Sequence, residues 1–302
     1  MELSRRTFFK IAGVAGAAGA VGRPAPVVGQ TRARPDARAM LVDTTRCIGC
    51  RACEAACAEA NGLPGSSDEP VVGTRRVTDP RTFTVVNAFA PKGDGDTRFV
   101  KTQCMHCVDP SCASACLVRA LEKTPEGPVI YHAELCLGCR YCMVACPFDV
   151  PKYEYDRAIP YVRKCEFCPG RQAAGEPPAC VSVCPSGALQ FGTRAELLDE
   201  ARTRIYQNPD RYVHHIYGEH EVGGTSWLYL ADRPFEELGL RADLGETPYP
   251  AYTWPFLSAV PLVLTLWPPF LMGLYAFTRS REEGGGEPAA AAEHSGEEVR
   301  HG

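Results

Sequence analysis

The sequence predicts an α+β protein with a loop-rich body and one C-terminal transmembrane helix. Sixteen of the 302 residues are cysteine, which is about three times the usual frequency. The 28 glycines and 26 prolines favour loops and short helices. A content of 45% apolar and 23% charged residues is typical of a folded globular chain. It excludes a disordered chain and a transporter with many spans.

Residues 1–39 are predicted to form an export signal. Arg5 and Arg6 precede two phenylalanines and the uncharged, alanine- and glycine-rich stretch 11–21, a pattern typical of the twin-arginine route. This stretch is too short to cross a bilayer, which needs about 20 apolar residues. The sequence Ala-Arg-Ala at 37–39 offers small residues for cleavage. The alternative is an N-terminal helix of the folded body.

The sixteen cysteines form four groups of four, with none left over. The groups are Cys47, Cys50, Cys53 and Cys57; Cys104, Cys107, Cys112 and Cys116; Cys136, Cys139, Cys142 and Cys146; and Cys165, Cys168, Cys180 and Cys184. Groups one and three have the spacing C-x2-C-x2-C-x3-C, in which three thiolates hold one 4Fe-4S cluster and the fourth serves another cluster. Gly49 and Gly138 occupy the same place in these two loops, where the missing side chain lets the backbone approach a cluster.

Two other uses of these cysteines compete with clusters. An exported protein normally forms disulfides, here eight of them, and paired C-x2-C units also suit zinc. Neither use explains three cysteines at three-residue intervals followed by a fourth four residues later. Twin-arginine export carries folded, cofactor-loaded proteins, so clusters inserted in the reducing cytosol would reach an oxidising compartment intact. The spacing therefore favours iron–sulfur clusters.

Between Met40 and about Leu230, the chain resembles the four-cluster ferredoxin subunits of respiratory oxidoreductases. The segment 217–230, YGEHEVGGTSWLYL, narrows this resemblance to the membrane-anchored members. These include the HybA-type subunits of membrane-bound nickel-iron hydrogenases and the formate dehydrogenase iron–sulfur subunits, in the same superfamily as those of dimethyl sulfoxide reductase. The fold that the resemblance implies is a tandem of nested, bacterial-ferredoxin-like dicluster modules.

The resemblance also implies four 4Fe-4S clusters, with the last cysteine of each group bound to a cluster of another group. We name each implied ligand set after one of its members. They are the Cys47 set (Cys47, Cys50, Cys53 and Cys184), the Cys104 set (Cys104, Cys107, Cys112 and Cys146), the Cys136 set (Cys136, Cys139, Cys142 and Cys116) and the Cys165 set (Cys165, Cys168, Cys180 and Cys57).

The predicted organisation nests one module inside another. A first ferredoxin half spans 40–103, an inner module 104–146, and a second half with a post-cluster segment 147–246. The spacing supports this nesting, because residues 120–123 and 129–131 read as a hairpin within a compact inner unit. The segment 62–101 is an insert, and residues 81–86 within it are predicted to form a strand. The insert is either a partner-binding surface or lid, or a segment that only packs against the body.

Side chains beside the cysteines predict how the clusters are tuned. Apolar residues there are expected to exclude water, and cations to stabilise reduced, more negative clusters; a solvated surface role is the alternative for each cation. The apolar residues are Ile48, Met105, Leu137, Val144 and Phe148, and the cations are Arg46, Arg51, Arg140 and Lys164. Five histidines are candidates for metal binding or proton transfer near a quinone, although surface or hydrogen-bonding roles are the default: His106, His132, His214, His215 and His220.

A membrane span is predicted within 247–278, a segment without charged residues or histidine, at Trp254 to Phe277. As a helix this span would run about 36 Å, enough to cross the hydrocarbon layer. Its prolines predict a kink, and hence a partner helix bundle that satisfies the freed carbonyls. Arginines after the span would stay cytoplasmic, and residues 279–302 read as a disordered cytoplasmic tail. A buried core helix is the alternative.

Together these features predict an electron-transfer subunit without catalytic residues of its own. The sequence shows no nicotinamide, flavin or molybdopterin motif, and the net charge of −4 gives no basic surface for nucleic acid. By resemblance, electrons would pass from the small and large subunits of a periplasmic hydrogenase, through the clusters, to an integral quinone-reactive subunit. A molybdoenzyme catalytic subunit, such as that of a formate dehydrogenase, is the alternative partner. A disulfide-rich exported scaffold is the remote alternative.

Overall fold

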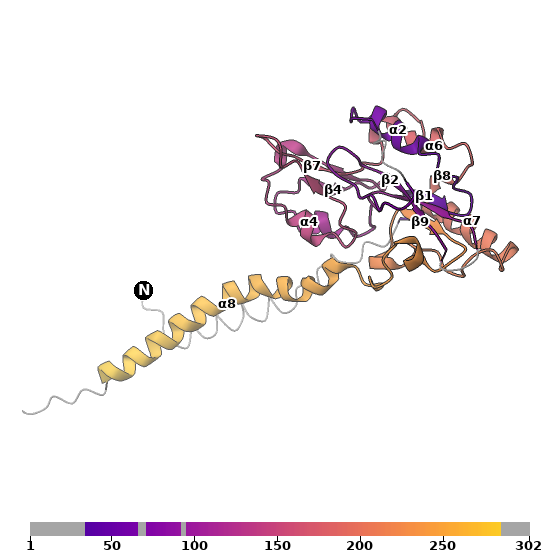
Figure 1. Cartoon of the computed structure of the whole chain (residues 1–302). Coiled ribbons are helices and arrows are strands. Elements are labelled where there is room, and N and C mark those ends of the chain that lie inside the picture. Colours follow the sequence, from indigo (N-terminus) through magenta and orange to yellow (C-terminus); the bar gives the residue numbers. More distant parts are fainter. Residues whose placement is uncertain (1–33, 66–70, 92–94, 285–302) are drawn as a thin grey trace, which may run out of the picture. The chain divides into compact units, whose positions relative to one another are not determined.

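The computed structural model describes residues 34–65, 71–91 and 95–284, with side chains up to residue 280 in the last helix. The core of the predicted export signal and residues 285–302 of the predicted C-terminal tail lie outside these residues. Residues 279–284 of that tail were predicted to be disordered, but they are helical and continue the last helix. The chain divides into two units, residues 1–252 and 253–302, and each is described by itself (Figure 1).

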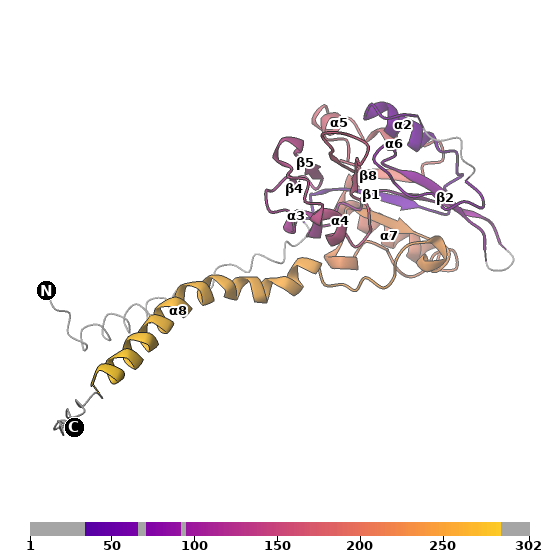
Figure 2. The same cartoon turned by 60° about the vertical axis from the view of Figure 1, so that its left-hand side comes forward.

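The body is built on a three-stranded sheet in the order β8-β1-β9. The central strand β1 (Arg38–Asp43) pairs antiparallel with β8 (Leu189–Thr193) and parallel with β9 (Trp227–Leu230). Residues from the start, middle and end of the body thus meet in one sheet (Figure 2). Because β1 is paired on both edges, it ties the N-terminal segment to the second half of the body.

Side chains of the sheet alternate between two cores. Met40 and Val42 of β1 belong to the larger core, which also contains several cysteines and Trp227. Ala39 and Leu41 belong to the smaller core, formed with the helix α7 (Arg194–Gln207). This alternation follows from the two-residue period of a strand. The sheet therefore separates α7 from the cysteine-rich side.

A short helix lies in or beside each cysteine group. Cys53 and Cys57 lie in α2 (Ala52–Ala60), and the other groups lie in or next to α3 (Ser111–Ser114), α4 (Tyr141–Ala145), α5 (Pro169–Ala173) and α6 (Ala179–Ser182). Helix α2 packs on α6, and α3 packs on α4. The helix of the first cysteine group therefore meets that of the fourth group, and the second meets the third. Three 3-10 turns complete the body: η1 (Ala133–Leu135), η2 (Glu221–Gly223) and η3 (Phe235–Leu238).

Three two-stranded hairpins surround these helices. They are β2 (Val85–Phe89) with β3 (Arg98–Thr102), β4 (Leu121–Lys123) with β5 (Val129–Tyr131), and β6 (Lys152–Tyr153) with β7 (Val162–Arg163). The hairpin predicted at 120–131 is confirmed by the antiparallel pair β4–β5. The strand predicted at 81–86 is displaced: β2 begins at Val85 and continues to Phe89.

A buried carboxylate fastens the β2–β3 hairpin to α2. Glu54 of α2 is 3% exposed and accepts hydrogen bonds from the guanidinium of Arg76 and from the backbone N–H of Val86. Val86 lies opposite Lys101 in the hairpin register. The insert is therefore packed firmly against the helix that carries Cys57, which favours the packing interpretation for its described residues.

The segment 34–39 belongs to the folded body. The N–H of Arg38 donates to the carbonyl of Glu126 at 2.7 Å, the N–H of Arg194 donates to that of Ala37 at 2.8 Å, and Ala39 is fully buried. A cut after residue 39 would remove the first two residues of the central strand. We therefore expect the mature chain to begin before Pro35. N-terminal sequencing of the exported protein checks this, and a mature chain starting at residue 40 would contradict it.

The second unit consists of most of helix α8 (Tyr249–Gly284). Residues 249–280 have a mean hydropathy of 1.7 in their most apolar part, and none of that part is buried. The helix is long and apolar enough to cross a membrane, in agreement with the predicted span. It remains helical through four prolines, Pro255, Pro261, Pro268 and Pro269.

Candidate functional site

The first and third cysteine groups lie in loops with the same backbone conformation. Gly49 and Gly138 both have φ +71°, and Arg51 and Arg140 have φ values of 61° and 62° just before α2 and α4. Two left-handed residues in each loop turn the chain sharply between successive cysteines. The first and third cysteine groups, which share the same spacing, thus also share the same backbone conformation.

Replacing Gly49 with alanine should destabilise the first of these loops. A Cβ atom at this position would lie 2.5 Å from Cδ1 of Phe99, and the left-handed backbone disfavours any side chain. We expect the free energy of unfolding to fall by about 2–4 kcal/mol in a denaturant titration. Gly175→Ala is the matched control, because Gly175 has φ +78° but no atom within 4 Å of the added Cβ. Equal losses in both variants would contradict the close contact with Phe99.

The Cys47 set gathers around one cavity. All four members line it, together with Val42, Val86 and Lys101. Cys47 and Cys50 come from the loop before α2, Cys53 comes from the first turn of α2, and Cys184 follows α6. Burial raises the pKa of Cys47, and the neighbouring thiol of Cys184 contributes to this rise. The structure thus brings together residues more than a hundred positions apart in the sequence.

The Cys165 set gathers around a second cavity. All four members line it, together with Asn61, Lys101, Phe167 and Trp227. Cys57 reaches this cavity from the C-terminal part of α2, and the amide of Asn61 lies 3.7 Å from its sulfur. Burial raises the pKa of Cys57 to about 11, and the thiols of Cys180 and Cys168 add to this effect. Cys53 and Cys57 of one helix thus face different cavities.

The Cys104 and Cys136 sets also assemble. Burial raises the pKa of Cys107 well above its usual range, and the other three thiols of its set, Cys146, Cys112 and Cys104, raise it further. Burial likewise raises the pKa of Cys142 to about 11, with contributions from the other thiols of its set, Cys136, Cys116 and Cys139. In each group, the last cysteine therefore lies with a different set from the first three cysteines.

The four sets follow one another in a row. In three pairs of cysteines from neighbouring sets, one thiol raises the pKa of the other: Cys180 raises that of Cys53, Cys104 that of Cys165, and Cys142 that of Cys112. Packing of α2 on α6 and of α3 on α4 agrees with two of these pairs. The order is therefore the Cys47 set, the Cys165 set, the Cys104 set and the Cys136 set. The spatial order differs from the order in the sequence because the last cysteine group packs next to the first.

The two ends of this row reach the surface. Cys50 of the first set and Cys139 of the last set are the exposed cysteines. Ile48, Leu137 and Val144 are 60%, 71% and 87% exposed, so the prediction that they exclude water is wrong. Ile48 and Leu137 lie in loops and Val144 lies in α4, at the two ends of the row. Met105 is buried, as predicted.

The donor set fits 4Fe-4S clusters. All sixteen cysteines are free thiols. In the described residues, no three Cys, His, Asp or Glu side chains converge closely enough to hold a single metal ion. Backbone N–H groups donate to sulfur: from Ala120 to Cys116 at 3.1 Å and from Gly138 to Cys136 at 3.4 Å. Such bonds stabilise cluster sulfurs. Burial raises the pKa of Cys53 to about 12, and a bound metal stabilises the thiolate form of a cysteine ligand.

Two buried lysines, Lys101 and Lys164, and the half-buried Lys123 lie among the cysteine sets. Lys164 was expected near a cluster, and it is 3% exposed with its ammonium on the carbonyls of Val129 and Cys165. Arg46 and Arg140, by contrast, are exposed. Lys101 was missed, because only the β2–β3 register places it between two cavities. Burial lowers the pKa of Lys101, but the thiols of Cys180, Cys53, Cys165 and Cys57 outweigh this effect and raise it overall.

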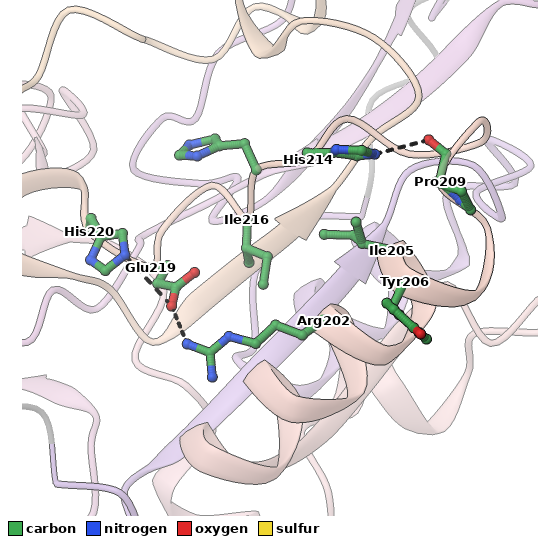
Figure 3. A pocket seen from close by; sticks show the side chains of 9 residues that line it. Arg202, Ile205, Tyr206, Pro209, His214, Ile216, Glu219 and His220 are labelled. Atoms are coloured by element: carbon green, nitrogen blue, oxygen red, sulfur yellow. Dashed lines mark hydrogen bonds and ion pairs between the residues drawn. The ribbon is translucent and has the colours of Figure 1, made fainter.

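The histidines do not join the cysteine sets. His214, His215 and His220 line an open groove beside α7, and no cysteine lies among its described lining residues (Figure 3). His215 contacts Glu221 at 2.6 Å. His106 is fully buried and its Nδ1 accepts a hydrogen bond from the N–H of Val129 at 2.9 Å; burial lowers the pKa of His106 well below its usual range. The hydrogen-bonding interpretation is thus favoured for these residues.

Comparison with known proteins agrees with this site. Residues 96–194 match the 4Fe-4S dicluster domain family, and residues 2–22 match the twin-arginine translocation pathway signal sequence. The fold and the cysteine sets therefore define an exported iron–sulfur protein of the ferredoxin type.

Relatives cover most of the chain. A protein of Nitratidesulfovibrio vulgaris is 45% identical over 96% of this chain and 81% of its own length. The hydrogenase-2 operon protein HybA of Escherichia coli O157:H7 is 39% identical over 68% of this chain and 73% of its own. The iron–sulfur subunit of the nitrate-inducible formate dehydrogenase of Escherichia coli is 35% identical over 68% and 72%. This chain belongs to the HybA-type family of electron-transfer iron–sulfur subunits.

Proposed function

We propose that this subunit carries electrons through four 4Fe-4S clusters, one held by each of the four cysteine sets. The observation that carries the proposal is the continuous row of sets, whose two middle members lie between two ends that reach the surface. The clusters supply the one-electron chemistry. The chain supplies the thiolates, the N–H donors to sulfur and the buried cations that accompany them.

The two exposed ends of the row suit entry and exit of electrons. Ile48 lies beside Cys50, and Leu137 and Val144 lie in the loop and helix around Cys139; all three are exposed apolar side chains. Exposed apolar residues next to a redox centre favour docking of another protein. One end would receive electrons from a catalytic subunit, and the other would pass them to an integral membrane subunit that reacts with quinone.

The partner that we propose is a periplasmic nickel-iron hydrogenase. The relative HybA belongs to a hydrogenase operon, and this chain carries its own twin-arginine signal together with the candidate span α8. That combination favours a HybA-like subunit over a formate dehydrogenase subunit, which usually travels on the signal of its catalytic partner. The body would lie on the periplasmic face of the cytoplasmic membrane, with residues 279–302 in the cytoplasm.

Purification in mild detergent tests this assignment. The complex should contain nickel and the small and large hydrogenase subunits, identified by metal analysis and mass spectrometry. A complex with a molybdenum subunit and no nickel would overturn the hydrogenase assignment. It would support the second candidate, a subunit of a formate dehydrogenase or other molybdopterin oxidoreductase. The 35% identical relative is the observation that favours this candidate.

A further inference from the structure

Lys101 occupies an unusual place in the row of cysteine sets. It lies in β3, is 3% exposed, and lines both the cavity of the Cys47 set and the cavity of the Cys165 set. Lys101 is the one residue that lines both of these described cavities. A single ammonium group thus stands beside two neighbouring sites.

The surroundings hold this ammonium in place without neutralising it. Its Nζ donates to Oε1 of Gln103 at 2.9 Å and lies 4.4 Å from the ring centre of Trp227. Gln103 is fixed in turn, because its amide donates to the hydroxyl of Tyr229 at 2.8 Å, and that hydroxyl donates to the carbonyl of Lys101 at 2.9 Å. In the described part of the chain, no carboxylate pairs with Lys101.

The half-buried Lys123 and the buried Lys164 differ from Lys101 in their partners. The ammonium of Lys123 donates to the carbonyls of His106 and Gly127 and lies 3.4 Å from the hydroxyl of Ser226. Lys164 donates to two carbonyls. An ammonium has three donors, and the described protein provides one hydrogen-bond acceptor for that of Lys101. Burying a cation with so few hydrogen-bond partners destabilises the folded state unless negative charge lies nearby.

The two cysteine sets provide that negative charge when they hold clusters. Cys180, Cys165 and Cys57 line one of the cavities that Lys101 lines, and Cys53 lines the other, so thiols of both sets lie beside it. A 4Fe-4S cluster with four thiolate ligands is anionic, and it gains one further negative charge when it accepts an electron. A fixed cation between two such clusters favours the reduced form of each.

We propose that Lys101 is a shared countercharge that raises the reduction potentials of the clusters in the Cys47 and Cys165 sets. It is a positioning and tuning residue, because it accepts no electron itself. This inference rests on the proposed function, since it requires a cluster in each of the two sets. Because Lys101 stabilises an added electron on either cluster, it keeps the reduction potentials of both clusters high enough for the same electron donor to reduce them.

Potentiometric titration of the purified full-length chain, followed by electron paramagnetic resonance, tests the proposal. In Lys101→Met, which keeps the length of the side chain and removes its charge, two midpoint potentials should shift to more negative values while two remain unchanged. Lys101→Arg should leave all four near their original values. Lys123→Met is the matched control, because Lys123 lies beside Cys107 and Cys104 and should shift a different cluster.

A second variant keeps the test decisive if Lys101→Met loses iron. Gln103→Glu retains the lysine and places a carboxylate against its ammonium, so the same two potentials should again shift negatively. Unchanged potentials in Gln103→Glu, or in a Lys101→Met protein with full iron content, would overturn the role of Lys101. Failure of the proposed function would look different: the unmodified protein itself would lack the iron and the spectra of four clusters.

Discussion

Combining Cys104→Ala with Cys146→Ala should remove one cluster, about four iron atoms, and leave three clusters intact. Both residues belong to the Cys104 set, so the two substitutions damage a single site. Combining Cys136→Ala with Cys146→Ala should instead disturb two clusters, because these neighbours in sequence belong to different sets. Iron analysis and Mössbauer spectroscopy of the purified variants distinguish one altered cluster from two.

The reciprocal pair provides the control for this crossed arrangement. Cys116→Ala with Cys136→Ala should again remove one cluster, this time that of the Cys136 set. If Cys104→Ala with Cys146→Ala altered two clusters and Cys136→Ala with Cys146→Ala altered one, each cysteine group would bind its own cluster. The crossed assignment of ligands would then be wrong.

Ending the chain after Glu246 should release the protein from the membrane. This change removes α8, whose apolar side chains are exposed along the 32 residues of the candidate span. Inserting about 20 apolar residues into a bilayer is strongly favourable, so the full-length protein should stay in the membrane fraction after an alkaline carbonate wash. The shortened protein should move almost entirely to the soluble fraction.

A replacement helix separates anchoring from recognition. An unrelated apolar helix of the same length in place of α8 should restore membrane attachment. It should not restore co-purification with the integral subunit if the proline-containing α8 packs against that partner. A shortened protein that resisted the carbonate wash would show that α8 is not the anchor.

Local patterns predicted much of the cysteine-rich body. Spacing alone identified the two equivalent loops, and turn residues located the β4–β5 hairpin, because both depend on neighbours in the sequence. That Cys184 lies with Cys47 could be expected only from the resemblance to a known family. Spacing within a group does not specify which distant group supplies the fourth ligand.

Features that depend on long-range packing were not predictable in this way. β1 was not predicted, and its first residues were assigned to the export signal, because small residues at 37–39 suit both a cleavage site and a buried strand. Ile48 and Leu137 were expected to shield clusters, but hydrophobicity does not show whether a loop faces the core or a partner. Lys101 was not predicted because its position depends on a hairpin register and on two cavities lined by residues far apart in the sequence.

Iron and acid-labile sulfide analysis of the purified full-length chain tests the central claim most directly. Four clusters held by the sixteen cysteines predict about sixteen iron atoms and about sixteen sulfides per chain. Electron paramagnetic resonance of the reduced protein should show interacting 4Fe-4S centres. A protein with the same cysteines but without iron and sulfide, and with eight disulfides in their place, would contradict the account.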